Sequence, residues 1–179
     1  MDGRVQRKLS AILSADVKGY SKLMGEDESY TVRALKECRK LFAENIQNHG
    51  GRVVNAPGDS ILAEFPSVVS AVQCAVEIQD KLKARNSDLP DNRKMDFRIG
   101  VNLGDVIEEE GRIYGDGVNI AARLEGLADA GGICISGTAF DQVKGKLSLG
   151  YQFIGEQTVK NIAEPIRVYK VLMDERDAG

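Results

Sequence analysis

Histidine and tryptophan are nearly absent from the sequence, which contains one histidine and no tryptophan. The single histidine, His49, precedes two glycines, so we expect it at the C-terminal end of a helix, where a protonated imidazole suits the helix dipole. With His49 in that role, a histidine-rich zinc site and a histidine-centred catalytic triad are poor explanations. Any chemistry is therefore expected from carboxylates, amides and cations.

Cysteine is also scarce, with three residues in the whole chain. Cys38, Cys74 and Cys134 are odd in number, widely spaced and set in apolar patterns. Such cysteines are typical of buried small side chains and not of disulfides or metal ligands. This usage favours a reducing, cytoplasmic setting.

Long apolar runs and an excess of basic residues are missing as well. The run from Leu9 to Ala15 is cut short by Asp16 and Lys18, so we predict neither a cleaved signal peptide nor a membrane segment. The formal net charge of -3 and the pI near 5.3 give no basic surface of the kind that binds nucleic acid. A phosphate group would need a local cluster of cations.

The hydrophobic pattern predicts an α+β fold. Its order is strand, helix, strand, strand, helix, strand through residue 104, which is that of a ferredoxin-like antiparallel sheet with helices packed on one face. One further helix and more strands extend this unit as a C-terminal α/β extension. The strands are predicted at 9–17, 52–55, 60–65, 95–103 and 132–136, with an irregular hairpin at 106–113. The helices are predicted at 28–48, 67–84 and after residue 115.

The length of 179 residues suits one domain. We assign it to residues 9–172, with flexible ends at 1–8 and 173–179. The domain is also compatible with being one module of a longer protein.

Two aspartates stand at the edges of apolar segments. Asp16 ends the first predicted strand, and Asp59 lies in the turn between the second and third strands. A lone Gly-Asp is most simply a turn, but two such carboxylates suit hard divalent cations, which are usually held by one or two carboxylates together with substrate phosphates. Two metals in turn stabilise the attacking and leaving oxygens of a phosphoryl displacement. The pair therefore indicates a nucleoside triphosphate as substrate.

A glycine-rich turn and a helix follow in the segment 114–125. Asn119 and Arg123 are four residues apart and so share one face of this helix. Taken alone, two such residues would most simply form part of a solvated polar helix face. Their occurrence together with the two aspartates instead favours a functional site.

Together these residues resemble the class III nucleotidyl cyclase catalytic domain, which makes cyclic AMP or cyclic GMP for intracellular signalling. The likeness runs from about Leu9 to Val171 and rests on the residues of six positions. Asp16 and Asp59 match the two metal-binding aspartates, Arg98 a phosphate-binding arginine, Asn119 and Arg123 the transition-state pair, and Lys160 the triphosphate-binding lysine.

The resemblance implies a mechanism with two Mg²⁺ or Mn²⁺ ions held by Asp16, Asp59 and the Val17 carbonyl. Arg123 would neutralise the transition-state phosphoryl group and Asn119 would orient the ribose. The backbone amides of Gly19, Tyr20 and Ser21 would cradle the triphosphate. The family also implies a homodimer, in which one chain supplies the aspartates of each site and its partner supplies the asparagine, arginine and lysine.

The chain departs from the family at the two base-selecting positions. Members that use ATP usually carry lysine at the first position and aspartate or threonine at the second. Members that use GTP usually carry glutamate and cysteine. This chain has Asn55 at the first position and Arg112 at the second. The Asn55 amide can both donate to and accept from the adenine edge, and Arg112 can donate to O6 and N7 of guanine. We expect ATP, with GTP as the alternative.

Other classes compete with an active cyclase. A catalytically silent cyclase-like module that binds nucleotide or dimerises is favoured only by the departures at Asn55 and Arg112. A diguanylate cyclase would carry a Gly-Gly-acid-acid-Phe hairpin in place of 57–60. Rossmann and P-loop enzymes lack support, because neither phosphate-binding fingerprint is present.

Overall fold

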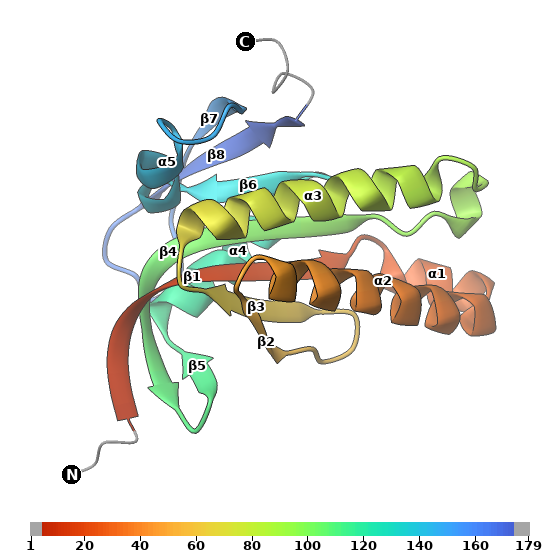
Figure 1. Ribbon diagram of the computed structural model, residues 1–179, viewed down its shortest axis with the longest axis horizontal. Helices are drawn as coiled ribbons and strands as arrows, with labels where there is room; N and C mark the ends of the chain where they lie inside the picture. The colour runs from red at the N-terminus through yellow and green to blue at the C-terminus, as the bar shows by residue number, and fades with distance from the viewer. Residues whose placement is uncertain (1–4, 174–179) are drawn as a thin grey trace.

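An eight-stranded sheet runs through residues 5–173, which are the residues that the computed structural model describes (Figure 1). Its strands lie in the order β2-β3-β1-β4-β6-β8-β7, with β5 paired to the far end of β4. The strands are β1 (Val5–Val17), β2 (Arg52–Asn55), β3 (Ile61–Phe65), β4 (Phe97–Glu109), β5 (Arg112–Tyr114), β6 (Ile133–Ser136), β7 (Gly150–Gln157) and β8 (Ile166–Leu172). The helices are α1 (Tyr20–Glu26), α2 (Glu28–Asn48), α3 (Val68–Asn86), the short 3₁₀ helix η1 (Asp91–Arg93), α4 (Asp116–Leu127) and α5 (Gly137–Val143).

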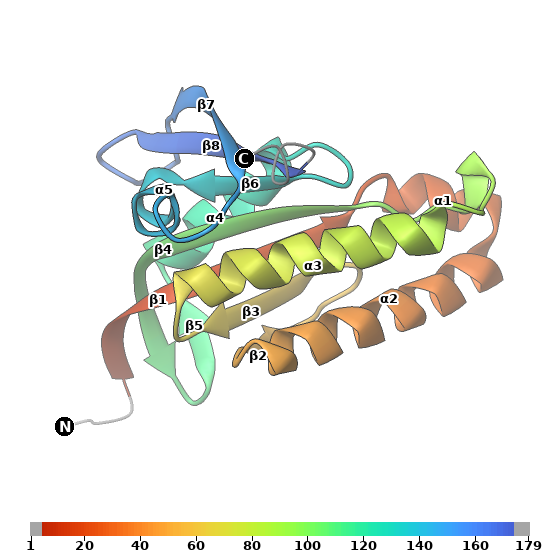
Figure 2. The ribbon, with the colours of Figure 1, turned by 45° about the horizontal axis from the view of Figure 1, so that its top comes forward.

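The ferredoxin-like order predicted from the sequence is confirmed. Strands β2, β3, β1 and β4 are neighbours and pair antiparallel, and α2 and α3 lie side by side on one face of them (Figures 1 and 2). The extension begins with β6, which pairs parallel to β4, and continues through β8 and β7. The hairpin expected at 106–113 is formed by the end of β4, which continues to Glu109, and by β5. The prediction left α1, α5, β7 and β8 unassigned.

The alternation of side chains along β1 divides the fold into two layers. Ala11, Leu13 and Ala15 belong to the large core beneath α2 and α3. Ile12 instead packs with Ala121 of α4 on the opposite face, in a smaller core. The sheet is therefore covered by helices on both faces, and α4 covers the second face over β1, β4 and β6 (Figure 1).

Element boundaries follow local signals. Asp27 caps α2 by accepting from the Tyr30 amide at 3.0 Å, and Ser67 caps α3 by accepting from the Ser70 amide at 3.3 Å. The first strand begins at Val5, earlier than the predicted Leu9, and residues 5–8 pair with β4. Of the predicted flexible ends, residues 1–4 and 174–179 lie outside the described residues.

The predictions for cysteine and histidine are also confirmed. All three cysteines are buried and free, and burial raises the pKa of each thiol, that of Cys38 to about 11. His49 ends α2, with Nδ1 at 2.7 Å from the Asn45 carbonyl and Nε2 at 2.5 Å from Glu77. Among the described residues, no helix is long and apolar enough to cross a membrane.

The close approach of α4 to β4 depends on Gly100. A Cβ atom at this position would lie 2.4 Å from the Glu125 amide nitrogen and 2.5 Å from the Ala121 carbonyl oxygen. Both are backbone atoms, so only a shift of the whole helix relieves the clash. We expect Gly100→Ala to lower the free energy of unfolding by about 3 kcal/mol, measured by urea denaturation.

A matched control lies on the helix itself. Gly126 is exposed near the end of α4, and a Cβ atom there would have no neighbour within 4 Å. Gly126→Ala should therefore raise stability slightly, by about 0.5–1 kcal/mol. Similar stabilities for the two variants would contradict the close packing of α4 on β4.

Candidate active site

Asp16 and Arg98 form a cross-strand ion pair at the end of β1. The two residues are directly opposite each other in the antiparallel pairing of β1 with β4. Arg98 Nε donates to Asp16 Oδ1 at 2.9 Å and Nη2 donates to Oδ2 at 2.5 Å. The hydrogen bond and charge of Asp16, together with the charges of Glu125 and Asp59, raise the pKa of the Arg98 guanidinium despite its partial burial. Both carboxylate oxygens of Asp16 are thus bound by one cation.

Asp59 reaches the same place from the hairpin between β2 and β3. Its Oδ2 accepts a hydrogen bond from the Val17 amide at 3.1 Å, which ties the hairpin turn to the end of β1. The structure therefore brings together Asp16, Val17 and Asp59, the three residues for which the sequence predicts metal ligation.

Glu125 is a fourth charged residue at this place, and the sequence analysis missed it. The Ser14 hydroxyl donates to its Oε1 at 3.0 Å, and its Oε2 lies 3.8 Å from Arg98 Nη2. Burial, followed by the negative charge of Asp16, raises the pKa of Glu125 to about 7. A signal was present, because Glu125 follows Val118 by seven residues and so lies on the sheet-facing side of the helix.

Gly19, Tyr20 and Ser21 lie just beyond Asp16, where the chain turns from β1 into α1. Gly19 has a φ of 70° and precedes the first residue of the helix, a left-handed conformation that favours glycine. The first-turn amides of a helix have no intrahelical acceptor. The predicted triphosphate cradle therefore lies at the same end of the sheet as the aspartates.

Asn119, Arg123 and Lys160 lie elsewhere. Asn119 and Arg123 are exposed on the outer face of α4, and Arg123 Nη2 donates to Gln157 Oε1 at 3.2 Å. Lys160 is exposed in the turn between β7 and β8. On a helix, Arg123 and Glu125 are separated by about 200°, so Arg123 points away from the Asp16 cluster. Within one chain the predicted site thus consists of two separate halves.

The two base-selecting candidates are both exposed. Asn55 ends β2, and its Oδ1 accepts from the adjacent Ala56 amide at 3.0 Å. Arg112 begins β5 and pairs across the hairpin with Glu109. Strands β2 and β5 adjoin on the α4 side of the sheet, where Val54 and Ile113 belong to the same small core. The structure leaves both polar side chains available to solvent.

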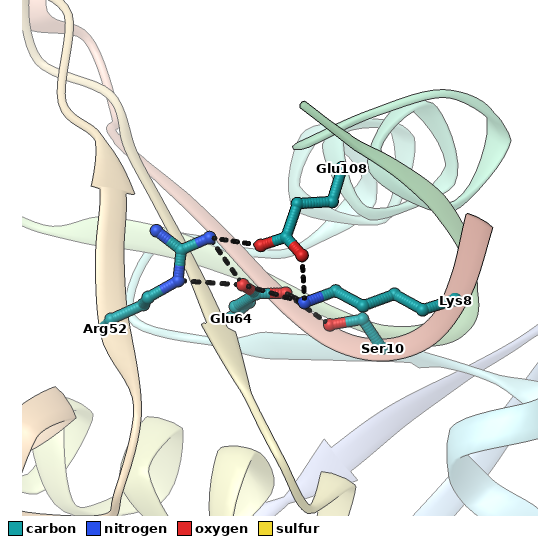
Figure 3. Close-up of polar contacts among 5 residues, drawn as sticks. All are labelled: Lys8, Ser10, Arg52, Glu64 and Glu108. Carbon is teal, nitrogen blue, oxygen red and sulfur yellow. Dashed lines mark hydrogen bonds and ion pairs between the residues drawn. The ribbon is translucent and has the colours of Figure 1, made fainter. Parts of the chain in front are cut away.

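An ion-pair network surrounds Glu64 near the start of β1 (Figure 3). Because side chains alternate along β1, its members Lys8 and Ser10 lie on the same face of the sheet as Asp16. Its centre is Glu64, whose side chain is 9% exposed. Glu64 accepts from Arg52 Nε and Ser10 Oγ, each at 2.8 Å, and lies 3.4 Å from Lys8 Nζ. Glu108 bridges Lys8 and Arg52 at 3.3 and 3.4 Å. Burial raises the pKa of Glu64, but the Ser10 and Arg52 hydrogen bonds and the charges of both cations outweigh it, so the net pKa is lowered.

A lowered pKa means that ionised Glu64 stabilises the fold above its unfolded pKa of about 4.5. We expect Glu64→Gln to cost about 2 kcal/mol at pH 7, because two basic side chains lose a charged partner. As the pH falls below 4.5 toward the lowered pKa of folded Glu64, the unfolded chain takes up a proton first, so the difference should shrink. Urea denaturation at pH 7 and pH 3.5 measures this, and a difference independent of pH would contradict the ionic role.

The donors at the end of β1 fit a hard divalent cation. Asp16, Asp59 and the Val17 carbonyl offer only oxygen atoms, the type preferred by Mg²⁺ and Mn²⁺. Within residues 5–173, no group of three or more Cys, His, Asp and Glu side chains is arranged to hold a metal. The two carboxylates would thus need further oxygens from the backbone and from a bound phosphate, as Mg²⁺ sites commonly do.

Comparison with known proteins identifies the family of the chain. Residues 6–172 match the family described as the adenylate and guanylate cyclase catalytic domain. Putative adenylate cyclase 3 of Rhizobium meliloti is 43% identical over 166 residues, which cover 92% of this chain and 28% of that protein. The chain thus spans less than a third of that relative's length.

Solved structures of cyclases also resemble this chain. The adenylate/guanylate cyclase/hydrolase of Silicibacter pomeroyi is 40% identical, with a TM-score of 0.88 and coverage of 94% of this chain and 98% of that one. The guanylyl cyclase Cya2 is 25% identical, with a TM-score of 0.78 and coverage of 93% and 92%. From its sequence, its sheet topology and these matches, the chain belongs to the adenylate and guanylate cyclase catalytic domain family.

Proposed function

We propose that this chain is a class III nucleotidyl cyclase that converts ATP to 3′,5′-cyclic AMP and pyrophosphate. The observation that carries the proposal is the convergence of Asp16, Val17 and Asp59 at the end of β1, created by the hydrogen bond from the Val17 amide to Asp59. The relative that is 43% identical is named as a putative adenylate cyclase, which supports ATP as the substrate.

In the proposed reaction the ribose 3′ oxygen attacks the α-phosphorus, the bond from that phosphorus to the β-phosphate oxygen breaks, and the 3′ hydroxyl proton is released. Bound Mg²⁺ or Mn²⁺ would lower the pKa of that hydroxyl and neutralise phosphate charge. Asp16, Asp59 and the Val17 carbonyl would hold two such ions. The amides of Gly19, Tyr20 and Ser21 would bind triphosphate oxygens.

The remaining roles belong to the outer face of α4 and to neighbouring cations. Arg123 would pair with the phosphoryl oxygens that gain charge in the transition state, and Asn119 would orient the ribose. Lys160 would bind the triphosphate, and Arg98 is proposed for phosphate binding as well. Arg98 is held by Asp16 in this structure, so a phosphate contact requires that ion pair to open.

We propose that a second copy of the chain completes each site. Arg123 points away from the Asp16 cluster of its own chain, so a substrate at Asp16 and Asp59 needs an arginine from elsewhere. A two-fold homodimer supplies it twice and forms two equivalent clefts. The length of the Rhizobium relative supports a regulatory domain attached in the full-length protein, and the free buried cysteines suit a cytoplasmic setting.

GTP is the second candidate substrate. Arg112 is exposed at the start of β5 and offers only donors, which suits the O6 and N7 acceptors of guanine. Asn55 offers the acceptor and donor that adenine needs. Both groups can be satisfied by solvent, so we expect discrimination between the bases to be modest.

The test is cyclic nucleotide formation from ATP and, separately, from GTP, with Mn²⁺ or Mg²⁺ at several protein concentrations. We expect cyclic AMP, with specific activity that rises with protein concentration as dimers form. Cyclic GMP as the main product would reverse the base assignment. No product from either nucleotide at high protein concentration with Mn²⁺ would support a silent nucleotide-binding or dimerisation module instead.

A further inference from the structure

The bidentate ion pair between Arg98 and Asp16 occupies the carboxylate that the proposed function needs for its cations. We propose that Arg98 competes with divalent cations for Asp16, and that Glu125 receives the guanidinium when Asp16 turns to a cation. This inference rests on the proposed function in one respect, the assignment of Asp16 and Asp59 as metal ligands. Arg98 is then a positioning residue that sets the affinity of the site for its cations.

The competition follows from the geometry of the pair. Arg98 donates to both oxygens of Asp16, at 2.9 and 2.5 Å, and both side chains are largely buried, being 22% and 17% exposed. A cation bound to Asp16 would therefore approach a fixed positive charge. Like charges this close repel each other, and the repulsion is stronger at a protein surface than in bulk water.

Glu125 is placed to take over the guanidinium. Ser14 holds its Oε1 from β1, and its Oε2 already lies 3.8 Å from Arg98 Nη2. The charged groups that face Arg98 are Asp16, Glu125 and Asp59. Arg98 can thus exchange Asp16 for Glu125 without moving into water, and the charge that leaves one carboxylate remains paired with the other.

The experiment measures Mn²⁺ binding to the chelator-treated full chain, with free Mn²⁺ followed by electron paramagnetic resonance. Arg98→Gln removes the competing cation and should tighten Mn²⁺ binding about 5–10-fold. Glu125→Gln removes the alternative partner and should weaken binding about 3-fold or more. If Mn²⁺ binding is too weak to detect in the wild type but is detected in Arg98→Gln, this result would also support the proposal.

Arg52→Gln is the matched control. Arg52 is also an arginine bound to a buried carboxylate on the same face of the sheet, that of Glu64, but it does not contact Asp16 (Figure 3). Its removal changes the net charge by the same amount, so Mn²⁺ affinity should stay within about 2-fold if long-range charge is unimportant. An equal gain in Arg52→Gln and Arg98→Gln would overturn the proposal.

The outcomes separate this inference from the proposed function. If Asp59→Asn abolishes Mn²⁺ binding but Arg98→Gln leaves it unchanged or weaker, the metal ligands stand and the competition is refuted. Unchanged Mn²⁺ affinity with weakened ATP binding would assign Arg98 to phosphate alone. If neither the wild type nor any variant binds Mn²⁺ in the absence of nucleotide, the competition is refuted, and the assay of cyclic nucleotide formation still decides the proposed function.

A second measurement on the wild type guards against a variant that does not fold. The Arg98 Nε–H group, which donates to Asp16 Oδ1, gives its own nuclear magnetic resonance signal. Addition of Mg²⁺ should shift this signal with the same midpoint as the Mg²⁺-dependent rise in melting temperature. If Mg²⁺ raises the melting temperature but does not shift the Arg98 Nε–H signal, the proposed exchange of Arg98 between Asp16 and Glu125 is refuted.

Discussion

Replacing Arg123 by alanine is expected to lower kcat for cyclic nucleotide formation about 10²–10³-fold, because one preorganised cation would be lost from the transition state. The fold should be unaffected, since Arg123 is exposed and its hydrogen bond is to Gln157 at 3.2 Å on the surface. The measurement is the initial rate at saturating ATP with Mn²⁺, alongside circular dichroism. KM should change much less than kcat, because the interaction is proposed for the transition state.

The control for this variant is Arg33→Ala. Arg33 is also an exposed arginine on a helix, but α2 lies on the opposite face of the sheet from α4. Its removal should leave kcat within about 2-fold, as expected for a surface substitution away from the site. A kcat for Arg123→Ala as high as that of Arg33→Ala would remove Arg123 from the proposed mechanism.

Mixing two inactive variants should restore activity. Asp59→Ala removes the metal half of the site and Arg123→Ala removes the transition-state half, so each homodimer has two broken clefts. After random exchange of subunits, half of the dimers are mixed, and each mixed dimer carries one intact cleft of two. We therefore expect an equimolar mixture to reach about a quarter of wild-type specific activity.

A second mixture is the control for subunit exchange. Asp59→Ala and Asp16→Ala damage the same half, so their mixed dimers contain no intact cleft and should stay inactive. Analytical ultracentrifugation would establish that both mixtures contain dimers. Dimers of Asp59→Ala with Arg123→Ala that gain no activity would show that the two halves act within one chain.

The sequence predicts the positions of those site residues that depend on local hydrophobic pattern and residue spacing. Asp16 ends an apolar strand and Asp59 lies in a hairpin turn, so their positions at strand ends follow from the chain itself. Asn119 and Arg123 share a helix face because they are four residues apart. Their roles in metal binding and catalysis come from the family resemblance and stay predictions.

The contacts that the sequence could not place depend on sheet register and on the packing of α4. Arg98 meets Asp16 across 82 residues of chain because β1 and β4 align them, and a slip of one residue would put them on opposite faces. The pKa of the partly buried Glu125 rises to about 7 only because α4 covers Ser14 and Asp16. The partner of a long-range strand is not encoded in local periodicity.

The contact at Gly100 constrains how this domain can be switched on. Backbone of α4 rests directly on backbone of β4 there, with no intervening side chains whose rotamers could absorb a shift. Helix and strand should therefore move as one rigid body, with the amides around Gly100 among the slowest to exchange hydrogen. In the proposed homodimer, an attached regulator would then act by turning one whole subunit against the other, so that Arg123 of one copy moves toward or away from the aspartates of its partner.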